Sequence, residues 1–207
     1  EFLITLLDDN ISEFPSFLKQ TENEYLNSKL IKKKRIEQED DITLPFSRFF
    51  NFLQQTDYHF EPQSKTPESN STTDIGIIAK NYSKFRVICF VEAKRLPTPQ
   101  GNDREENEYV HYFNKSKQGG IERFKSGKHA GKENLNFSIM LGYIQSNDFV
   151  FWNNKINDWI DQQINDSSKP DIHWNLNDKL KLDKEFVKRC VSKYKSSHSR
   201  KNLPDIN

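Results

Sequence analysis

Three charged residues in two neighbouring segments could act together on a substrate. Glu92 and Lys94 follow the apolar run 87–91, and alternation along a strand would place both side chains on one face. Asp74 lies eighteen positions before Glu92, at the start of a shorter apolar run, so hairpin pairing would bring the two carboxylates together. Adjacent carboxylates repel each other, and a hard divalent cation such as Mg²⁺, or Mn²⁺ in its place, relieves this repulsion by binding both.

Such a cation would support the hydrolysis of phosphodiester bonds. The backbone carbonyl of Ala93 could provide a further oxygen ligand. The cation would polarise a phosphodiester oxygen and activate a water molecule, while the Lys94 ammonium orients that water and offsets negative charge. Two simpler interpretations exist: Glu-x-Lys is common in surface ion pairs, and Asp74 could be a turn residue bonded to its own backbone.

The elements that must position these residues follow from hydrophobic periodicity and from turn-forming residues. We predict a helix over 16–34, then a second helix capped by Asp41 or Thr43 with Pro45 in its first turn. The stretches 62–73 and 97–107 are predicted loops, and 81–84 a turn. Strands are expected near 58 and at 75–78, 86–94 and 137–144, and a strand or a short helix at 186–194. Helices are expected at 149–164 and at 108–124, where Gly119 and Gly120 weaken or break the second of these. This order predicts an α/β sandwich.

Asp74 with Glu92-Ala93-Lys94 at the end of a hydrophobic strand resembles the signature of the PD-(D/E)xK (restriction-endonuclease-like) nuclease superfamily. The resemblance covers residues 41–145, although Thr73 stands where the family often has a proline. It implies an α/β/α core around a central mixed sheet of four to five strands. That nuclease domain would occupy residues 41–207, after a helical N-terminal extension over residues 1–40.

The resemblance also implies a function. It indicates a metal-dependent endonuclease that hydrolyses DNA with Mg²⁺ or Mn²⁺, in a bacterial or phage restriction or antiviral defence system. Its partners would be DNA and either a second copy of the chain or a larger defence complex. The alternatives are a catalytically silent nucleic-acid-binding or scaffold subunit and an RNA-directed nuclease of the same fold.

Family members often add an acidic residue from the first core helix to the metal site. Glu39, or Glu37, occupies the comparable place here, with a solvated or helix-capping role as the alternative. The second core helix often supplies polar residues that face the substrate. The candidates for substrate binding are Gln118, Arg123 and Lys125, for which a helix cap and surface ion pairs are the alternatives.

A basic turn follows the second predicted core helix. His129 lies in this turn, 125–130, which could contact phosphate or serve only as a loop. The stretch 181–201 is strongly basic, and its end, 193–201, could follow a nucleic-acid backbone or form a solvated tail.

Composition indicates a folded chain without a strong overall charge. Charged residues reach 29% and the net charge is +1, so the whole-chain charge does not identify a nucleic-acid binder. Sixteen Phe, seven Tyr and three Trp can supply a buried core. Cys89 and Cys190 lack the spacing of zinc ligands, and no segment predicts a membrane span or a secretion signal. We therefore expect a soluble, cytoplasmic protein.

Overall fold

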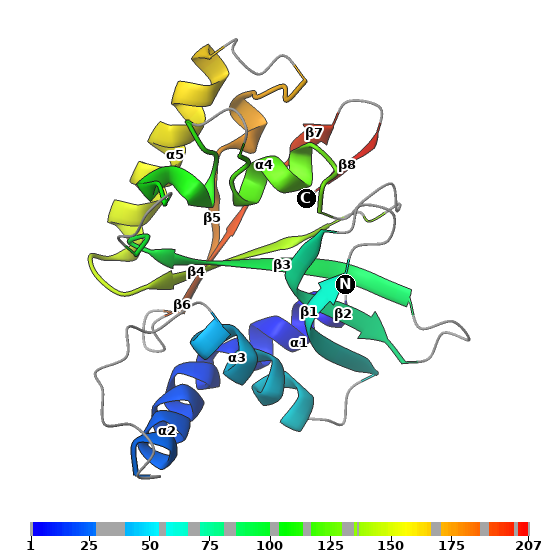
Figure 1. Cartoon of the computed structure of the whole chain (residues 1–207), viewed down its shortest axis with the longest axis vertical. Coiled ribbons are helices and arrows are strands. Elements are labelled where there is room, and N and C mark those ends of the chain that lie inside the picture. The colour runs from blue at the N-terminus through cyan, green and yellow to red at the C-terminus, as the bar shows by residue number, and fades with distance from the viewer. Residues whose placement is uncertain are drawn as a thin grey trace.

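The computed structural model describes residues 2–27, 40–53, 57–65, 71–80, 86–99, 104–113, 117–129, 135, 137–166, 171–186, 191–200 and 203–206. A four-stranded sheet in the order β1-β2-β3-β4 crosses its centre (Figure 1). The antiparallel strands are β1 (Tyr58–Lys65), β2 (Thr72–Ala79) and β3 (Arg86–Leu96). β4 (Ile139–Ile144) runs parallel to β3, so the predicted α/β class and mixed sheet are confirmed.

Helices cover both faces of this sheet. Figure 1 shows α1 (Phe2–Asn10), α2 (Phe14–Asn27) and α3 (Asp40–Phe52) on one side of the sheet. The short 3₁₀ helix η1 (Ile11–Glu13) joins α1 to α2. On the other side lie α4 (Gly120–Lys125) and α5 (Phe149–Asn165). The chain thus forms three layers.

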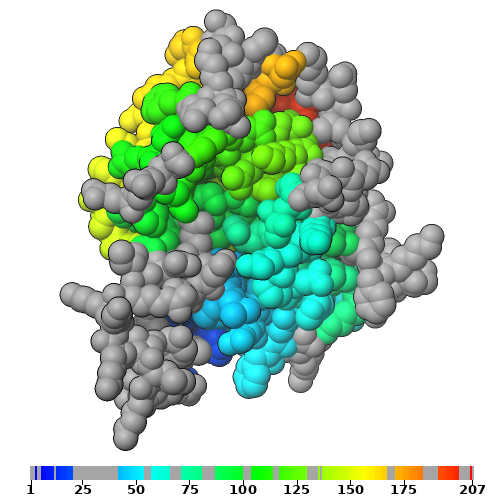
Figure 2. Space-filling model, in the orientation of Figure 1, coloured from blue at the N-terminus to red at the C-terminus, as the bar shows by residue number. Residues whose placement is uncertain are grey.

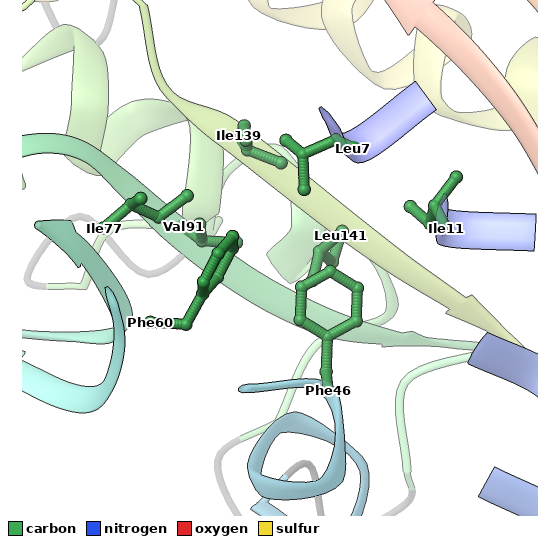
Figure 3. A pocket seen from close by; sticks show the side chains of 8 residues that line it. All are labelled: Leu7, Ile11, Phe46, Phe60, Ile77, Val91, Ile139 and Leu141. Carbon is green, nitrogen blue, oxygen red and sulfur yellow. The ribbon is translucent and has the colours of Figure 1, made fainter. Parts of the chain in front are cut away.

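A phenylalanine-rich core fills the first interface. Phe46, Phe49 and Phe50 of α3 share it with Phe14 of α2 and Leu3 of α1, so the predicted N-terminal extension packs into the same core as α3. The rings of Phe50 and Phe60 stack with their centroids 5.0 Å apart. A small pocket here is lined by the eight apolar side chains labelled in Figure 3 and offers no group for chemistry.

The N-terminal helices differ from the prediction at their ends. α2 begins at Phe14 and is described to Asn27, and the rest of the predicted helix 16–34 lies outside the described residues. The capping prediction for Asp41 and Thr43 was wrong, because α3 begins at Asp40 and includes both. Pro45 accordingly lies inside α3 and not in its first turn.

β1 is longer than predicted. It continues through Pro62 to Lys65, so the first part of the predicted loop 62–73 is strand, while 66–70 lie outside the described residues. Proline is tolerated because β1 is an edge strand, where a missing N–H breaks no central ladder. The next residue, Gln63, has a φ of 51°, in the left-handed region. Asn51 ties α3 to this strand by bonding both the N–H and the carbonyl of Phe60.

The predicted helix 108–124 is helical only in parts, and its predicted break at Gly119-Gly120 lies at the start of a separate short helix. The chain instead forms a short 3₁₀ helix, η2 (Glu106–Tyr109), and enters α4 only at Gly120. Direct backbone packing explains the difference, since a Cβ on Gly119 would lie 2.4 Å from the backbone nitrogen of His111. The two glycines, which were predicted to weaken or break the helix, therefore stand at the start of a separate helix that packs against the preceding segment. The predicted helix 149–164 agrees with α5 to within one residue.

The C-terminal segment forms hairpins. η3 (Leu176–Asp178) precedes β5 (Lys181–Phe186), β6 (Val191–Lys195), β7 (His198–Arg200) and β8 (Leu203–Ile206). The described ends of 186–194 are thus strand. The basic stretch is not simply a solvated tail, because His198 and Arg200 are buried.

Of the two cysteines, Cys89 is buried, whereas Cys190 lies outside the described residues. The predicted turn 81–84 also lies outside the described residues. Among the described residues, no helix has the length and apolar character needed to cross a membrane.

Candidate active site

The pairing of β2 with β3 places the predicted charges on neighbouring strands. Ile75 lies opposite Val91, and both side chains belong to the phenylalanine-rich core. Alternation therefore turns Asp74, Glu92 and Lys94 to the opposite face, toward α4. The Asp74 carboxylate reaches across to β3, where its Oδ2 accepts the N–H of Ala93 at 2.6 Å.

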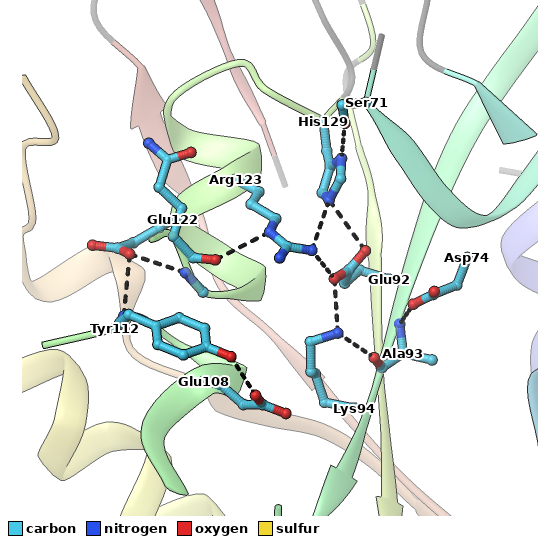
Figure 4. A network of polar contacts seen from close by, with 12 residues as sticks. Ser71, Asp74, Glu92, Ala93, Lys94, Glu108, Tyr112, Glu122, Arg123 and His129 are labelled. Atoms are coloured by element: carbon cyan, nitrogen blue, oxygen red, sulfur yellow. Dashed lines mark hydrogen bonds and ion pairs between the residues drawn. The ribbon is translucent and has the colours of Figure 1, made fainter. Parts of the chain in front are cut away.

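Lys94, Arg123 and His129 all contact Glu92, and we call these four residues the Glu92 cluster. Glu92 lies at its centre. Its Oε1 accepts hydrogen bonds from Lys94 Nζ and from Arg123 Nη1, each at 2.8 Å. Its Oε2 lies 3.2 Å from Nε2 of His129. Figure 4 shows these three partners directed at the carboxylate from different sides. Only 1% of Glu92 is exposed.

The partners keep Glu92 ionised despite its burial. Burial by itself would raise the pKa of the carboxyl. The hydrogen bond from His129 and the positive charges of Lys94 and Arg123 outweigh this effect and lower the pKa from 4.5 to about 2. At neutral pH Glu92 is therefore an anion, which is the form in which a carboxylate binds a metal ion.

Lys94 lies between two of the predicted metal ligands. Besides Glu92 Oε1, its Nζ donates to the carbonyl of Ala93 at 2.8 Å. The residue is 7% exposed, so the ammonium is nearly sealed from solvent. The Lys94 ammonium thus bonds both the Glu92 oxygen and the Ala93 carbonyl oxygen that were predicted to bind a cation.

Arg123 extends from α4 to Glu92. Its Nε donates to the backbone carbonyl of Gln118 at 3.0 Å, so two bonds fix the guanidinium. Gln118 contributes its main chain here, while its side-chain oxygen accepts from Ser126. The structure thus brings Arg123 to the site, and Gln118 only as a support for Arg123.

His129 links Glu92 to the start of β2. The Ser71 hydroxyl lies 2.7 Å from His129 Nδ1, and the ring is 2% exposed. A carboxylate oxygen can only accept, so Nε2 carries a proton toward Glu92, whereas the Ser71 hydroxyl can either donate to Nδ1 or accept from it. The predicted basic turn therefore places His129 against the catalytic candidate, and its backbone N–H bonds the carbonyl of Arg123.

Three residues that sequence reasoning missed support α4. Glu122 is fully buried, and its Oε2 accepts the N–H groups of Gly119 and Tyr112 at 3.0 and 3.3 Å. The Tyr112 hydroxyl donates to buried Glu108 at 2.5 Å. The recognised sequence signal for such a Glu is a Ser or Thr three residues earlier, and Gly119 stands there instead, so only half of that signal is present. The segments of β1–β2 (cyan) and α4 (green) meet on the face shown in Figure 2.

Lys125, the third predicted substrate-binding residue, lies outside the Glu92 cluster. Its Nζ bonds Asp178 Oδ1 at 2.6 Å and sits 5.0 Å from the centre of the Trp174 ring. His198 Nδ1 donates to the same Asp178 oxygen at 2.5 Å. The structure therefore does not bring Lys125 to the Glu92 cluster, because its side chain leaves α4 in another direction and is buried beside Asp178. We call Asp178, Lys125 and His198 the Asp178 cluster.

The oxygen atoms near Glu92 suit a divalent cation in chemical type. Asp74, Glu92 and the Ala93 carbonyl are all oxygen donors, which Mg²⁺ and Mn²⁺ prefer. Glu39 and Glu37 lie outside the described residues. Across the part of the chain that is described, no three His, Cys, Asp or Glu side chains group as a ready-made metal site. Two carboxylates, a carbonyl and water would have to suffice.

Comparisons with protein-family models, with curated proteins and with solved structures found no match to this chain.

Proposed function

We propose that this protein is a metal-dependent endonuclease of the restriction-endonuclease-like class that hydrolyses DNA phosphodiester bonds. One observation carries the proposal: Asp74, Glu92 and Lys94 share one face of adjacent strands, with the cations of Lys94 and Arg123 on a buried Glu92. The order of α3, the meander β1–β3, α4 and parallel β4 supports it. A cytoplasmic restriction or defence role, and action as a homodimer or within a larger complex, belong to the same proposal.

The residues divide the chemistry between them. Asp74, Glu92 and the Ala93 carbonyl would hold the Mg²⁺ or Mn²⁺, which when bound supplies Lewis acidity and lowers the pKa of a water. The Lys94 ammonium orients that water and offsets the negative charge that develops on the phosphate. Arg123 offers N–H groups to a phosphate oxygen, and His129 holds Oε2, the second oxygen of Glu92.

A silent nucleic-acid-binding subunit is the second candidate. It is favoured by the saturation of Glu92, whose two oxygens already have three partners. In that case the cluster would only hold β3 to α4, and no cation would be needed.

Isosteric variants separate these functions. The purified protein is incubated with supercoiled plasmid, linear duplex, single-stranded DNA and RNA, each with Mg²⁺ or Mn²⁺. Asp74→Asn keeps an acceptor for the Ala93 N–H but removes the charge, and Lys94→Met removes the ammonium. We expect both to lower the cleavage rate by about 10³-fold, as the loss of one strong transition-state contact does.

The matched control is Lys155→Met on α5, which removes one positive charge from a surface pair with Glu106. It should cleave like the wild type. DNA cleavage that survives both site substitutions would refute the site, and binding of DNA without any cleavage would favour the silent subunit. Preferential cleavage of RNA would retain the chemistry and replace the substrate.

A further inference from the structure

We propose that Arg123 occupies the place of the metal ion on Glu92 and moves from the carboxylate to the phosphodiester when cation and substrate bind together. The inference rests on the proposed function, because it concerns how the same site is loaded. It goes further in giving Arg123 two successive partners and in coupling the binding of metal to that of substrate.

Two cationic side chains already bind the Glu92 oxygen that a metal ion would use, Oε1. Lys94 Nζ and Arg123 Nη1 both lie 2.8 Å from this one atom. A divalent cation bound to the same oxygen would stand next to two positive charges in a buried place, where repulsion is weakly screened. One of the two side chains has to withdraw for a cation to bind well.

Arg123 is the side chain able to withdraw. The Lys94 side chain is 9% exposed and is also held by the Ala93 carbonyl, whereas the Arg123 side chain is 29% exposed. Arg123 also keeps an anchor, because its Nε bond to Gln118 does not involve Glu92. Rotation about that anchor would release Nη1 and leave the guanidinium beside the site.

The charged side chains of the site also balance one another before any cation binds. Asp74 and Glu92 carry two negative charges, and Lys94 and Arg123 carry two positive charges, so the charges of these four groups sum to zero. A divalent cation alone would leave two positive charges uncompensated. A phosphodiester anion reduces that excess and gives Arg123 a new bidentate partner. Cation and phosphodiester should therefore bind more tightly together than separately, and the coupling is reciprocal.

The test measures Mn²⁺ binding by calorimetry, without nucleic acid, so it does not depend on cleavage. Arg123→Met removes the competing charge, and we expect it to tighten Mn²⁺ binding by about tenfold. Arg123→Lys keeps a cation near Glu92 and should stay within about twofold of the wild type. Lys155→Met removes a distant charge and should also leave the affinity unchanged. Circular dichroism confirms that each variant is folded, and Arg123→Gln serves if Arg123→Met is not.

A second titration adds dimethyl phosphate as a simple phosphodiester. It should tighten Mn²⁺ binding to the wild type by several-fold and to Arg123→Met by less, because the methionine cannot receive the anion. Unchanged or weaker Mn²⁺ binding by Arg123→Met would overturn the exchange, and so would an equal gain in Lys155→Met. If Arg123→Met binds Mn²⁺ more tightly but the wild type cleaves no nucleic acid, the exchange is supported and the endonuclease is rejected. If the wild type cleaves DNA but Arg123→Met binds Mn²⁺ no more tightly than the wild type does, the endonuclease is supported and the exchange is rejected.

Discussion

The Glu92 and Asp178 clusters use the same three kinds of residue. Each carboxylate bonds a lysine and a histidine, and each histidine contacts a serine through its second ring nitrogen, Ser71 in one cluster and Ser196 in the other. α4 supplies one cation to each cluster, Arg123 to Glu92 and Lys125 to Asp178.

The clusters differ in how tightly their cations are enclosed. The Lys125 and Asp178 side chains are 1% and 0% exposed, and Asp178 Oδ2 also accepts the N–H of Asn175. Around Glu92, by contrast, the Arg123 side chain is 29% exposed. An enclosed pair cannot exchange its partners, so the Asp178 cluster cross-links α4, η3 and β7. Ser196, His198 and Asp178 have the residue types of a hydrolytic triad, but Lys125 already compensates the carboxylate. Exposure of one partner is what makes the Glu92 cluster a candidate for chemistry.

The largest effect on stability should come from Lys125→Met. Removing the lysine leaves Asp178 buried with less compensation, and loss of one partner of a buried ion pair costs about 3–5 kcal/mol. Urea unfolding at pH 7 measures the change. Lys94→Met should cost less, because Glu92 keeps Arg123 and His129, and Lys155→Met on the surface should cost below about 1 kcal/mol. A greater loss in Lys94→Met than in Lys125→Met would invert the comparison.

Low pH should lower the free energy of unfolding, because Glu92 and Asp178 become protonated. The pKa of Glu92 is lowered from 4.5 to about 2, so its contribution to stability is complete above pH 4.5 and is lost as the pH falls toward 2. This contribution is on the order of 3 kcal/mol. Burial would raise the pKa of Asp178, but hydrogen bonds from His198 and Lys125 lower it below 3.8, so its contribution also disappears in acid.

Urea unfolding of the wild type and of Glu92→Gln between pH 7 and pH 2.5 isolates the part that belongs to Glu92. The variant should show a shallower loss of stability below pH 4.5, with Asp178 responsible for much of the remainder. Parallel curves for the two proteins would mean that Glu92 titrates alike in the folded and unfolded chains.

The smallest effect should come from the two serines. Ser71→Ala and Ser196→Ala each remove one hydrogen bond to a histidine ring and should each cost about 1 kcal/mol. Only Ser71→Ala should also slow cleavage, by a few-fold, because the His129 ring loses the bond that orients it beside Glu92. An equal loss of cleavage in Ser196→Ala would remove the functional distinction between the clusters.

The charges on the sheet could be predicted because they depend on local rules. Glu92 and Lys94 share a face through strand alternation, and Asp74 joins them through a pairing of strands that are neighbours in sequence. The position of Arg123 was harder to predict, because it depends on Gly119 packing against the backbone of His111. The resemblance to a nuclease family pointed to Arg123, whereas periodicity suggested one long helix there.

The Asp178 cluster could not be predicted. Lys125 and Asp178 are 53 residues apart and come from elements that no local pattern relates. A lysine in a basic turn and an aspartate in a polar segment both look solvated in the sequence, and only tertiary packing buries them together. Long-range contacts of this kind decide which charged residues become structural.

The edge of the sheet at β1 has a consequence for self-association. An open edge strand is a template onto which another chain can add a strand. β1 carries Pro62, which offers no N–H, followed by Gln63 with its left-handed backbone, so the edge is interrupted at mid-strand. A second copy could not continue the ladder past this point. If the protein cuts both DNA strands as a dimer, its two copies should meet through helices or loops and not through a shared sheet across β1.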